Sequence, residues 1–354
     1  MGILSGYLMR TILASTMLVL MVLLALATLF EFIGELDNKM GDYGIPQALM
    51  YSILRLPQVA FQMLPMATLI GALVGLGGLA SSSELVVMRA AGLSVEKLAG
   101  MVAITGVVMM VITAFIGEYI GPPLDYYART MRNEARFQHD ERNSGNAAWV
   151  KDGQAILHLE RVNSEFEFGR IYIFRFNDDN SLRSIARAEN SGIDDSDKWI
   201  LENYRETRFQ DDSIQVVKTS RAVESFDLSG DMLGITLVKP VSLSAKGLIS
   251  YIRYLKKNNL SSGRYETELW SRVSTTVTVV IMPVLALAFV FGSLRVSGAG
   301  GRIMIGVLIG LAYYLASEMI ANSGQVYDLD PALVTWLPSL ALLAVTVFAI
   351  DRVR

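Results

Sequence analysis

The sequence predicts an α-helical membrane protein with six transmembrane helices and an all-β domain inserted between the third and the fourth. Three observations predict this fold class. Hydrophobic residues make up 52% of the 354 residues and charged residues only 18%, whereas about 25% of an average soluble domain is charged. Long apolar runs fill both ends of the chain. A long polar stretch with short-period alternation separates them.

The predicted spans are apolar runs of about 20 residues, the length that a helix needs to cross a bilayer. They cover residues 12–33, 56–79, 98–120, 269–291, 303–321 and 332–350. The first run lacks the short apolar core and cleavage pattern of a signal peptide, so we expect it to be retained. We therefore expect three segments: 1–124 with helices 1–3, 125–264 with the β domain and its flanking helices, and 265–354 with helices 4–6.

Small residues predict which spans pack closely, and basic residues predict the orientation of the spans across the membrane. The pairs Gly71/Gly75 and Gly306/Gly310 have the GxxxG spacing that allows close helix contacts. Loop cations gather on one side of the membrane, whereas the other side has Lys39 in its short connections. The gathered cations are Arg10, Arg89, Lys97, Arg295, Arg302, Arg352 and Arg354. Because cytoplasmic loops are enriched in Lys and Arg, we expect both termini in the cytoplasm and the β domain on the opposite side.

The inserted segment is predicted to form short strands. "RIYIFRF" (170–176) alternates, with Ile171, Ile173 and Arg175 on one face of the strand. Residues 199–209 and 213–226 are further candidates, and polar turn clusters lie between such runs. This pattern is typical of an all-β sandwich or barrel. Residues 124–137 have helical spacing before the strands, and a helix capped by Ser242 or Ser244 is expected to lead back to the membrane.

"SSSELVVMRAAGLS" (81–94) predicts a short helix on the cytoplasmic side between the second and third spans. Ser81 and Glu84 match a capping box, Leu85 and Met88 share one face, and Gly92 can end the helix with a positive φ. Two interpretations remain open. The helix either rests on lipid or docks into a cytoplasmic partner.

Cations near the outer surface form a second candidate site. Arg129, Arg132 and Arg136 have the spacing of one helix face, and Arg55 lies near the start of the second span. Stacked guanidinium groups bind phosphate strongly. They also reach lipid headgroups by snorkelling. The sequence leaves both interpretations open.

No motif predicts catalysis or a cofactor on this chain. The glycine-rich stretches lack the lysine of a phosphate-binding loop, and no nucleophile or zinc-hydrolase motif occurs. There are no cysteines, and His139 and His158 lack metal-ligand spacing. The net charge of −3 argues against nucleic-acid binding.

Three longer stretches resemble one known family, the lipopolysaccharide-export permeases LptF and LptG. They are "SSSELVVMRAAGLS" (81–94), "FIGEYIGPPLDYYARTMRNEA" (115–135) and "GRYETELWSRV" (263–273), and "LPMATLIGALVGLGGLA" (64–80) agrees. "SELVVMRAAG" resembles the LptG branch more than LptF. The resemblance implies six spans and a periplasmic β-jellyroll in the bacterial inner membrane.

The family's function implies partners for this chain. The resemblance implies a permease subunit of an ABC-type transporter, paired with an LptF-like permease, an LptB-like ATPase dimer and an LptC-like membrane protein. ATP and Mg would bind the ATPase. The complex would extract lipopolysaccharide from the inner membrane and pass it to a periplasmic bridge. A membrane-anchored periplasmic enzyme or sensor, and another ABC permease for lipid or lipoprotein, are the alternatives.

The resemblance also implies roles for individual residues. The helix within 81–92 would be the coupling helix seated in the ATPase, with Glu84, Leu85, Met88, Arg89, Ala91 and Gly92 at the contact. Arg129 and Arg132 match arginines near lipid A phosphates, and Arg272 matches a basic position at the start of the fourth helix. Arg136, Lys39 and Arg55 complete the expected lipopolysaccharide-binding set. The sequence departs from the family at Glu31 and Gln58, where basic residues occur in some members.

Overall fold

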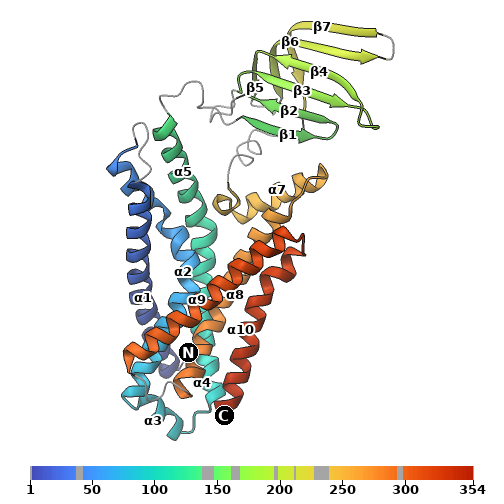
Figure 1. Ribbon diagram of the computed structural model, residues 1–354. Helices are drawn as coiled ribbons and strands as arrows, with labels where there is room; N and C mark the ends of the chain where they lie inside the picture. The colour runs from blue at the N-terminus through green and yellow to red at the C-terminus, as the bar shows by residue number, and fades with distance from the viewer. Residues whose placement is uncertain are drawn as a thin grey trace. The chain divides into compact units, whose positions relative to one another are not determined.

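In the computed structural model the chain forms two compact units. The described residues are 2–36, 43–137, 147–160, 168–194, 198–210, 213–226, 239–292 and 298–353. The helical unit comprises those within 1–39, 44–129 and 263–354, and the β unit comprises those within 40–43 and 130–262. Figure 1 shows the helices and strands with their labels. The predictions at Lys39, His139, Arg295 and Arg354 lie outside the described residues.

Six helices among the described residues are long and apolar enough to cross a membrane, which confirms the predicted number. They are α1 (Ile3–Leu36), α2 (Ile45–Ser81), α4 (Val95–Phe115) with its extension, α8 (Gly263–Phe291), α9 (Ala299–Val326) and α10 (Pro331–Val353). Each helix is longer than its apolar run, and α1 begins at residue 3 rather than 12. Helix propagation explains this, because each added residue gains a backbone hydrogen bond whatever its polarity.

The third span continues into a polar extension through one wide turn. A π-helical turn, η1 (Ile116–Ile120), joins α4 to α5 (Gly121–Phe137). Two glycines at this turn lie against α2. A Cβ at Gly117 would lie 2.5 Å from the Phe61 ring, and one at Gly121 would lie 2.6 Å from Gln58 Oε1. The helix predicted at 124–137 is thus confirmed as α5.

Both glycine pairs pack α2 against a neighbour. A Cβ at Gly71 would lie 2.4 Å from Thr16 Cα on α1, and one at Gly75 would lie 2.9 Å from Ser15 Oγ. Gly306 and Gly310 lie on α9. A Cβ added at these positions would lie 2.9 Å and 2.7 Å, respectively, from side chains of α2. The helix contacts predicted from the GxxxG spacing are confirmed, and they place α2 in contact with both α1 and α9.

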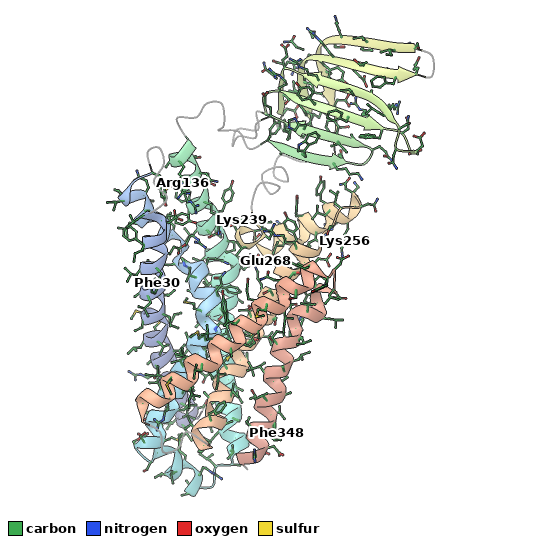
Figure 2. All side chains as sticks on the ribbon, viewed as in Figure 1. Phe30, Arg136, Lys239, Lys256, Glu268 and Phe348 are labelled. Atoms are coloured by element: carbon green, nitrogen blue, oxygen red, sulfur yellow. The ribbon has the colours of Figure 1, made fainter. Side chains whose placement is uncertain are left out.

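The centre of the helical unit is formed by α2 and α8. In their most apolar windows 72% and 61% of residues are buried, against 17% for α1 and 11% for α9. Large apolar side chains cover the outer helices, including Phe30 on α1 and Phe348 on α10, which are 71% and 67% exposed (Figure 2). Apolar surface of this extent is expected of a multi-pass membrane protein, whose surroundings are lipid or other subunits.

Hydroxyl groups join three helices inside the bundle. Ser339 of α10 lies 2.7 Å from Ser274 Oγ and 2.8 Å from Thr278 Oγ1, both on α8. Tyr313 of α9 reaches the same group, 3.0 Å from Ser339 Oγ. Because a polar group buried in an apolar bundle needs a partner, these contacts fix α8, α9 and α10 relative to one another.

The β unit contains one curled antiparallel sheet of seven described strands (Figure 1). The strands are β1 (Ala148–Asp152), β2 (Ala155–Leu159), β3 (Ile171–Phe176), β4 (Leu182–Ala188), β5 (Asn190–Ile193), β6 (Trp199–Gln210) and β7 (Ser213–Glu224). β1 to β4 follow in order, β6 then pairs with β4 and β5, and β7 pairs with β6. The strands predicted at 170–176, 199–209 and 213–226 are confirmed.

Buried and exposed side chains alternate along the strands, and the buried ones form the core of this unit. Ile171 and Ile173 are fully buried on one face of β3, as predicted. In β6, Trp199 and Leu201 are buried, and the buried positions then shift to Tyr204 and Glu206. The intervening Asn203 has φ 52°, and this break in the extended backbone exchanges the faces of the strand.

A correction concerns the return to the membrane. One continuous helix was expected, but α7 (Ala245–Lys257) ends before α8 begins at Gly263. Ser244 caps α7 by accepting from Gly247 N at 3.1 Å, so the Ser244 alternative is confirmed and not Ser242. The helix ends at this point because the Asn258 side chain accepts a hydrogen bond from Gly153 N at 2.8 Å and Asn259 adopts a φ of 54°. Asparagine side chains that bond to backbone compete with helix propagation.

Candidate functional site

The short helix α3 (Glu84–Ala90) connects α2 to α4, and its start differs from the prediction. Ser83 is the N-cap residue, with φ 63°, and makes no side-chain cap. Ser81 still belongs to α2 and donates to Gly77 O at 2.9 Å. The predicted capping box at Ser81 is therefore wrong. The serine hydroxyls bond back to the preceding turn, and this favours continuation of α2 over capping.

The end of α3 agrees with the prediction. Gly92 has φ 91° and donates to Arg89 O at 3.0 Å, and Leu93 N donates to Met88 O at 3.3 Å. This pair of bonds is the Schellman arrangement that glycine allows. It turns the chain sharply into α4, where Ser94 accepts from Lys97 N at 3.3 Å as the next cap. Defined backbone on both sides gives α3 a fixed position.

Three contacts attach α3 to the helical unit. Leu85 is 1% exposed and lies in the main core, with Met88 packed beside it. Glu84 accepts a hydrogen bond from Tyr7 of α1 at 2.8 Å. The Arg89 guanidinium lies 5.5 Å from the centre of the Phe291 ring at the end of α8. α3 is therefore connected to α1 and α8 as well as to its neighbours in sequence.

The outward face of α3 differs from the face that the sequence singled out. Leu85 and Met88 serve the chain's own core. Val86 and Val87 are 45% and 65% exposed instead, and Arg89, Ala91 and Gly92 are exposed beside them. Sequence reasoning missed the two valines, although the run "LVVM" contains the signal: only one helical face of four consecutive apolar residues can enter the core.

A buried carboxylate joins two of the predicted lipopolysaccharide-binding arginines. Asp125 of α5 is completely buried. Its oxygens accept from Arg55 Nε at 2.8 Å and from Arg129 Nε at 2.7 Å. Arg55 also pairs with Glu31 of α1. The four side chains balance two positive charges with two negative ones and connect α1, α2 and α5.

The other predicted cations have contacts of their own. Arg132 and Arg136 follow Arg129 on α5, and the Arg136 guanidinium lies 4.7 Å from the centre of the Tyr43 ring. Arg272 is 7% exposed on α8 and donates to Glu268 Oε1 at 3.1 Å. The structure thus brings Arg55 and Arg129 together but places Arg272 with a different carboxylate.

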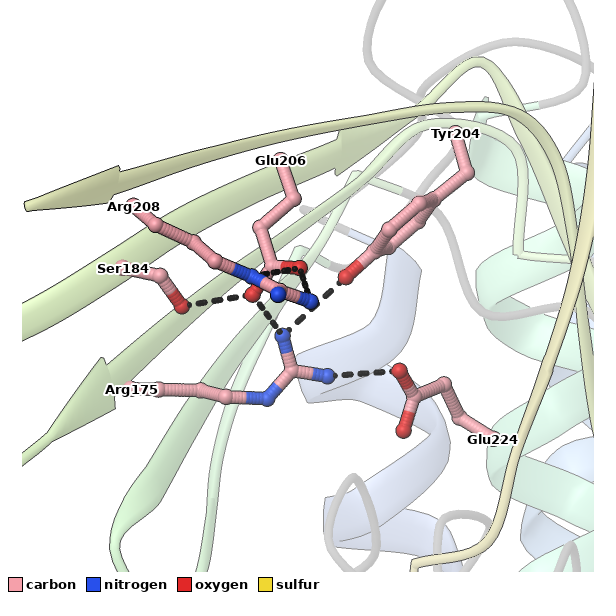
Figure 3. A network of polar contacts seen from close by, with 6 residues as sticks. All are labelled: Arg175, Ser184, Tyr204, Glu206, Arg208 and Glu224. Carbon is pink, nitrogen blue, oxygen red and sulfur yellow. Dashed lines mark hydrogen bonds and ion pairs between the residues drawn. The ribbon is translucent and has the colours of Figure 1, made fainter. Parts of the chain in front are cut away.

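The β unit contains a charged network that the sequence did not predict (Figure 3). Glu206 accepts from Arg175 at 3.0 Å, from Ser184 at 2.8 Å and from Arg208 at 2.8 Å. Arg175 also donates to Glu224 at 2.8 Å. Burial acts to raise the pKa of Glu206, but the hydrogen bonds from Arg208 and Ser184 and the charge of Arg175 outweigh it, and the pKa falls below its ordinary value of 4.5.

This network predicts acid sensitivity of the β unit. A carboxylate with a lowered pKa in the folded state stabilises the fold above its unfolded pKa, and this stability is lost as the pH falls through the folded pKa. Glu206→Gln is expected to cost about 1.5 kcal/mol at neutral pH. The cost should shrink as the pH falls below 4.5. Hydrogen exchange of β6 peptides in variant and wild type, compared at each pH, measures it.

Glu160 provides the control for this experiment. Its oxygen lies 3.7 Å from Arg170 Nη1, and both side chains are exposed. Glu160→Gln should leave exchange in β6 unchanged at every pH. A difference between Glu206→Gln and wild type that is independent of pH would show that the charge of Glu206 is not the source of the stability.

A family model named "Lipopolysaccharide export system permease LptF/LptG" matches residues 6–352. The chain belongs to this family. Membership and the six apolar helices together indicate a multi-pass membrane permease. The family predicted from the sequence is therefore confirmed.

Individual relatives agree with the family assignment over the whole chain. The permease protein LptG of Escherichia coli strain K12 is 32% identical over 354 residues, covering 99% of this chain and 98% of the relative. LptG of Haemophilus influenzae is 32% identical over 355 residues, covering 99% of both chains. LptF of Escherichia coli strain K12 is 24% identical over 370 residues, covering 96% of this chain and 92% of that one. This permease is thus more similar to these LptG proteins than to that LptF.

Proposed function

We propose that this permease is the LptG-like subunit of an ATP-driven lipopolysaccharide exporter, and that a separate ATPase drives it through α3. The observation that carries the proposal is the construction of α3. It is anchored in the core by Leu85 and exposes Val86 and Val87. An exposed apolar pair on a rigid helix suits a groove of a protein partner. The sequence has no phosphate-binding loop motif, so ATP would be hydrolysed by the partner.

The basic ends of the helices support a cytoplasmic position for α3. Arg10 of α1, Arg89 of α3, Lys97 of α4, Arg302 of α9 and Arg352 of α10 belong to the end of the helical unit where both termini lie (Figure 1). By the positive-inside rule this end faces the cytoplasm. In our proposal the permease lies in the bacterial inner membrane with its β unit in the periplasm.

The remaining subunits follow from the family. We propose an LptF-like permease as the second half of the transmembrane complex, an LptB-like ATPase dimer carrying ATP and Mg, and an LptC-like membrane protein beside them. The names of the relatives support lipopolysaccharide as the transported lipid. The guanidinium groups of Arg129, Arg132 and Arg136 on α5 would meet its phosphates.

Val87→Asp tests the docking role of α3. The variant is expected to weaken co-purification of the ATPase at least about tenfold, because an interface would have to bury an unpaired carboxylate. Val216→Asp on β7 is the matched control, since Val216 is 58% exposed and belongs to the β unit, whereas α3 belongs to the helical unit. ATPase retention and lipopolysaccharide release are measured in detergent or nanodiscs. If Val87→Asp retains the ATPase and releases lipid as the control does, α3 is not the docking element.

A further inference from the structure

Arg302 in the first turn of α9 is a buried charge, and the proposed function uses it only as one of the cations that mark the cytoplasmic end. The residue is 3% exposed. Its Nη2 donates to Ser81 Oγ at 2.8 Å. Within the described part of the chain no carboxylate lies at ion-pair distance from it, and its Nε has no hydrogen-bond partner. Such a charge costs stability, and an apolar side chain would pack the same helices more favourably. Arg302 is therefore poorly explained as packing alone.

The position of Ser81 indicates which part of the helical unit Arg302 contacts. Ser81 is the last residue of α2, three positions before α3 begins at Glu84. The Arg302 side chain also lies against Gly77, where an added Cβ would meet its Cδ at 2.5 Å and its Nη1 at 2.6 Å. A side chain at position 77, one turn before the end of α2, would therefore displace the Arg302 guanidinium.

The two glycines of α9 meet apolar side chains of α2. Gly306 faces Leu73 and Ile70, and Gly310 faces Met66, so the two helices meet along a row of small and aliphatic residues. Between helices in lipid such a contact has no hydrophobic driving force and little directionality. A hydrogen bond at one end fixes the register of the two helices along their axes, which a smooth apolar contact does not.

We propose that Arg302 is a positioning residue that ties α9 to the junction of α2 and α3, so that movement of α3 is transmitted to α9. The proposal rests on the proposed function, in which an ATPase moves α3. Without the tie, α9 would slip along α2 when α3 moves. ATP would still be hydrolysed, but less lipopolysaccharide would be released for each ATP.

Three substitutions break the tie in different ways. Ser81→Ala removes the acceptor, Arg302→Met removes the donor, and Gly77→Ala displaces the guanidinium without changing either partner. Gly78→Ala is the matched control, because a Cβ there meets nothing within 4 Å. The measurement is lipopolysaccharide released per ATP by the whole complex in nanodiscs, together with the ATPase rate and the unfolding temperature.

We expect the first three variants to lower release per ATP about threefold or more, the scale of one interhelical hydrogen bond. The ATPase rate and unfolding temperature should stay near wild type in Ser81→Ala, and Gly78→Ala should be unchanged. Arg302→Lys should recover part of the loss because lysine also donates to Ser81. Ser81→Ala combined with Arg302→Met should lose no more than Arg302→Met alone, because both remove one contact.

The outcomes separate this inference from the proposed function. If the wild-type complex shows no ATP-dependent release, the proposed function fails. If the wild type releases lipid and Ser81→Ala and Gly77→Ala release as much per ATP as Gly78→Ala, the tie has no role. If release falls only in proportion to the unfolding temperature, Arg302 has a structural role alone and the proposal is overturned. Ser81→Ala decides the matter should Arg302→Met fail to fold.

Discussion

Replacing Asp125 with alanine is expected to destabilise the helical unit by about 3 kcal/mol. Asp125 is the completely buried acceptor for both Arg55 and Arg129. Removing one partner of a buried ion pair leaves the other charge without compensation, and here two charges lose their partner. We take the lower end of the usual range because Glu31 still pairs with Arg55 and the two arginine side chains are 23% and 20% exposed.

Thermal unfolding of the purified permease in detergent measures this effect. Asp125→Asn should be less damaging, since it keeps one acceptor oxygen and the shape of the side chain. Glu31→Ala should cost less than Asp125→Ala because Glu31 pairs with only one of the two arginines. Asp178→Ala, at an exposed position, is the neutral control. Equal unfolding temperatures for Asp125→Ala and Asp178→Ala would show that Asp125 does not hold the arginines.

Gly71→Leu is expected to destabilise the contact between α1 and α2 by about 3 kcal/mol. A Cβ at this position would lie 2.4 Å from Thr16 Cα and 2.6 Å from Thr16 N. Both are backbone atoms, so no side-chain rotation relieves the overlap and the helices must separate. Separation also removes the neighbouring contact at Gly75.

Gly100→Leu on α4 is the comparison for this variant. A Cβ there meets nothing within 4 Å, and leucine has a higher helix propensity than glycine. Unfolding temperature and the monodisperse fraction on size exclusion should fall for Gly71→Leu and hold for Gly100→Leu. The same behaviour in both variants would mean that α1 and α2 do not approach as closely as the structure has them.

The elements that the sequence predicts well are those determined by local pattern. The six spans follow from apolar length, since a helix must satisfy its own backbone in lipid. The end of α3 follows from Gly92, whose positive φ disfavours other residues. The strands around Ile171 and Trp199 follow from alternation and aromatic content. Each of these signals is contained within a few neighbouring residues.

The features that the sequence does not predict depend on distant contacts. Arg55 and Asp125 are 70 positions apart, and nothing local identifies them as partners. Their pairing makes Arg55 a link between α2 and α5, and its contact with lipopolysaccharide stays a prediction. The orientation of α3 was likewise decided by the bundle, because the core accepts Leu85 and leaves Val87 exposed. Ser81 differs from the predicted cap for the same reason, since its hydroxyl donates to Gly77 O of α2 and accepts from Arg302.

The wide turn η1 determines the direction around the helix axis in which the side chains of α5 project. Each residue of a regular α-helix advances the chain by about 100°, and a π turn accommodates about one residue more than an α turn. Shortening the stretch 116–120 by one residue would therefore swing Asp125 and Arg129 about a quarter of a circumference away from Arg55. Family members that have lost or gained a residue there should carry their charges at correspondingly displaced positions, and a lysine or arginine matched by alignment alone would be assigned to the wrong side of the helix.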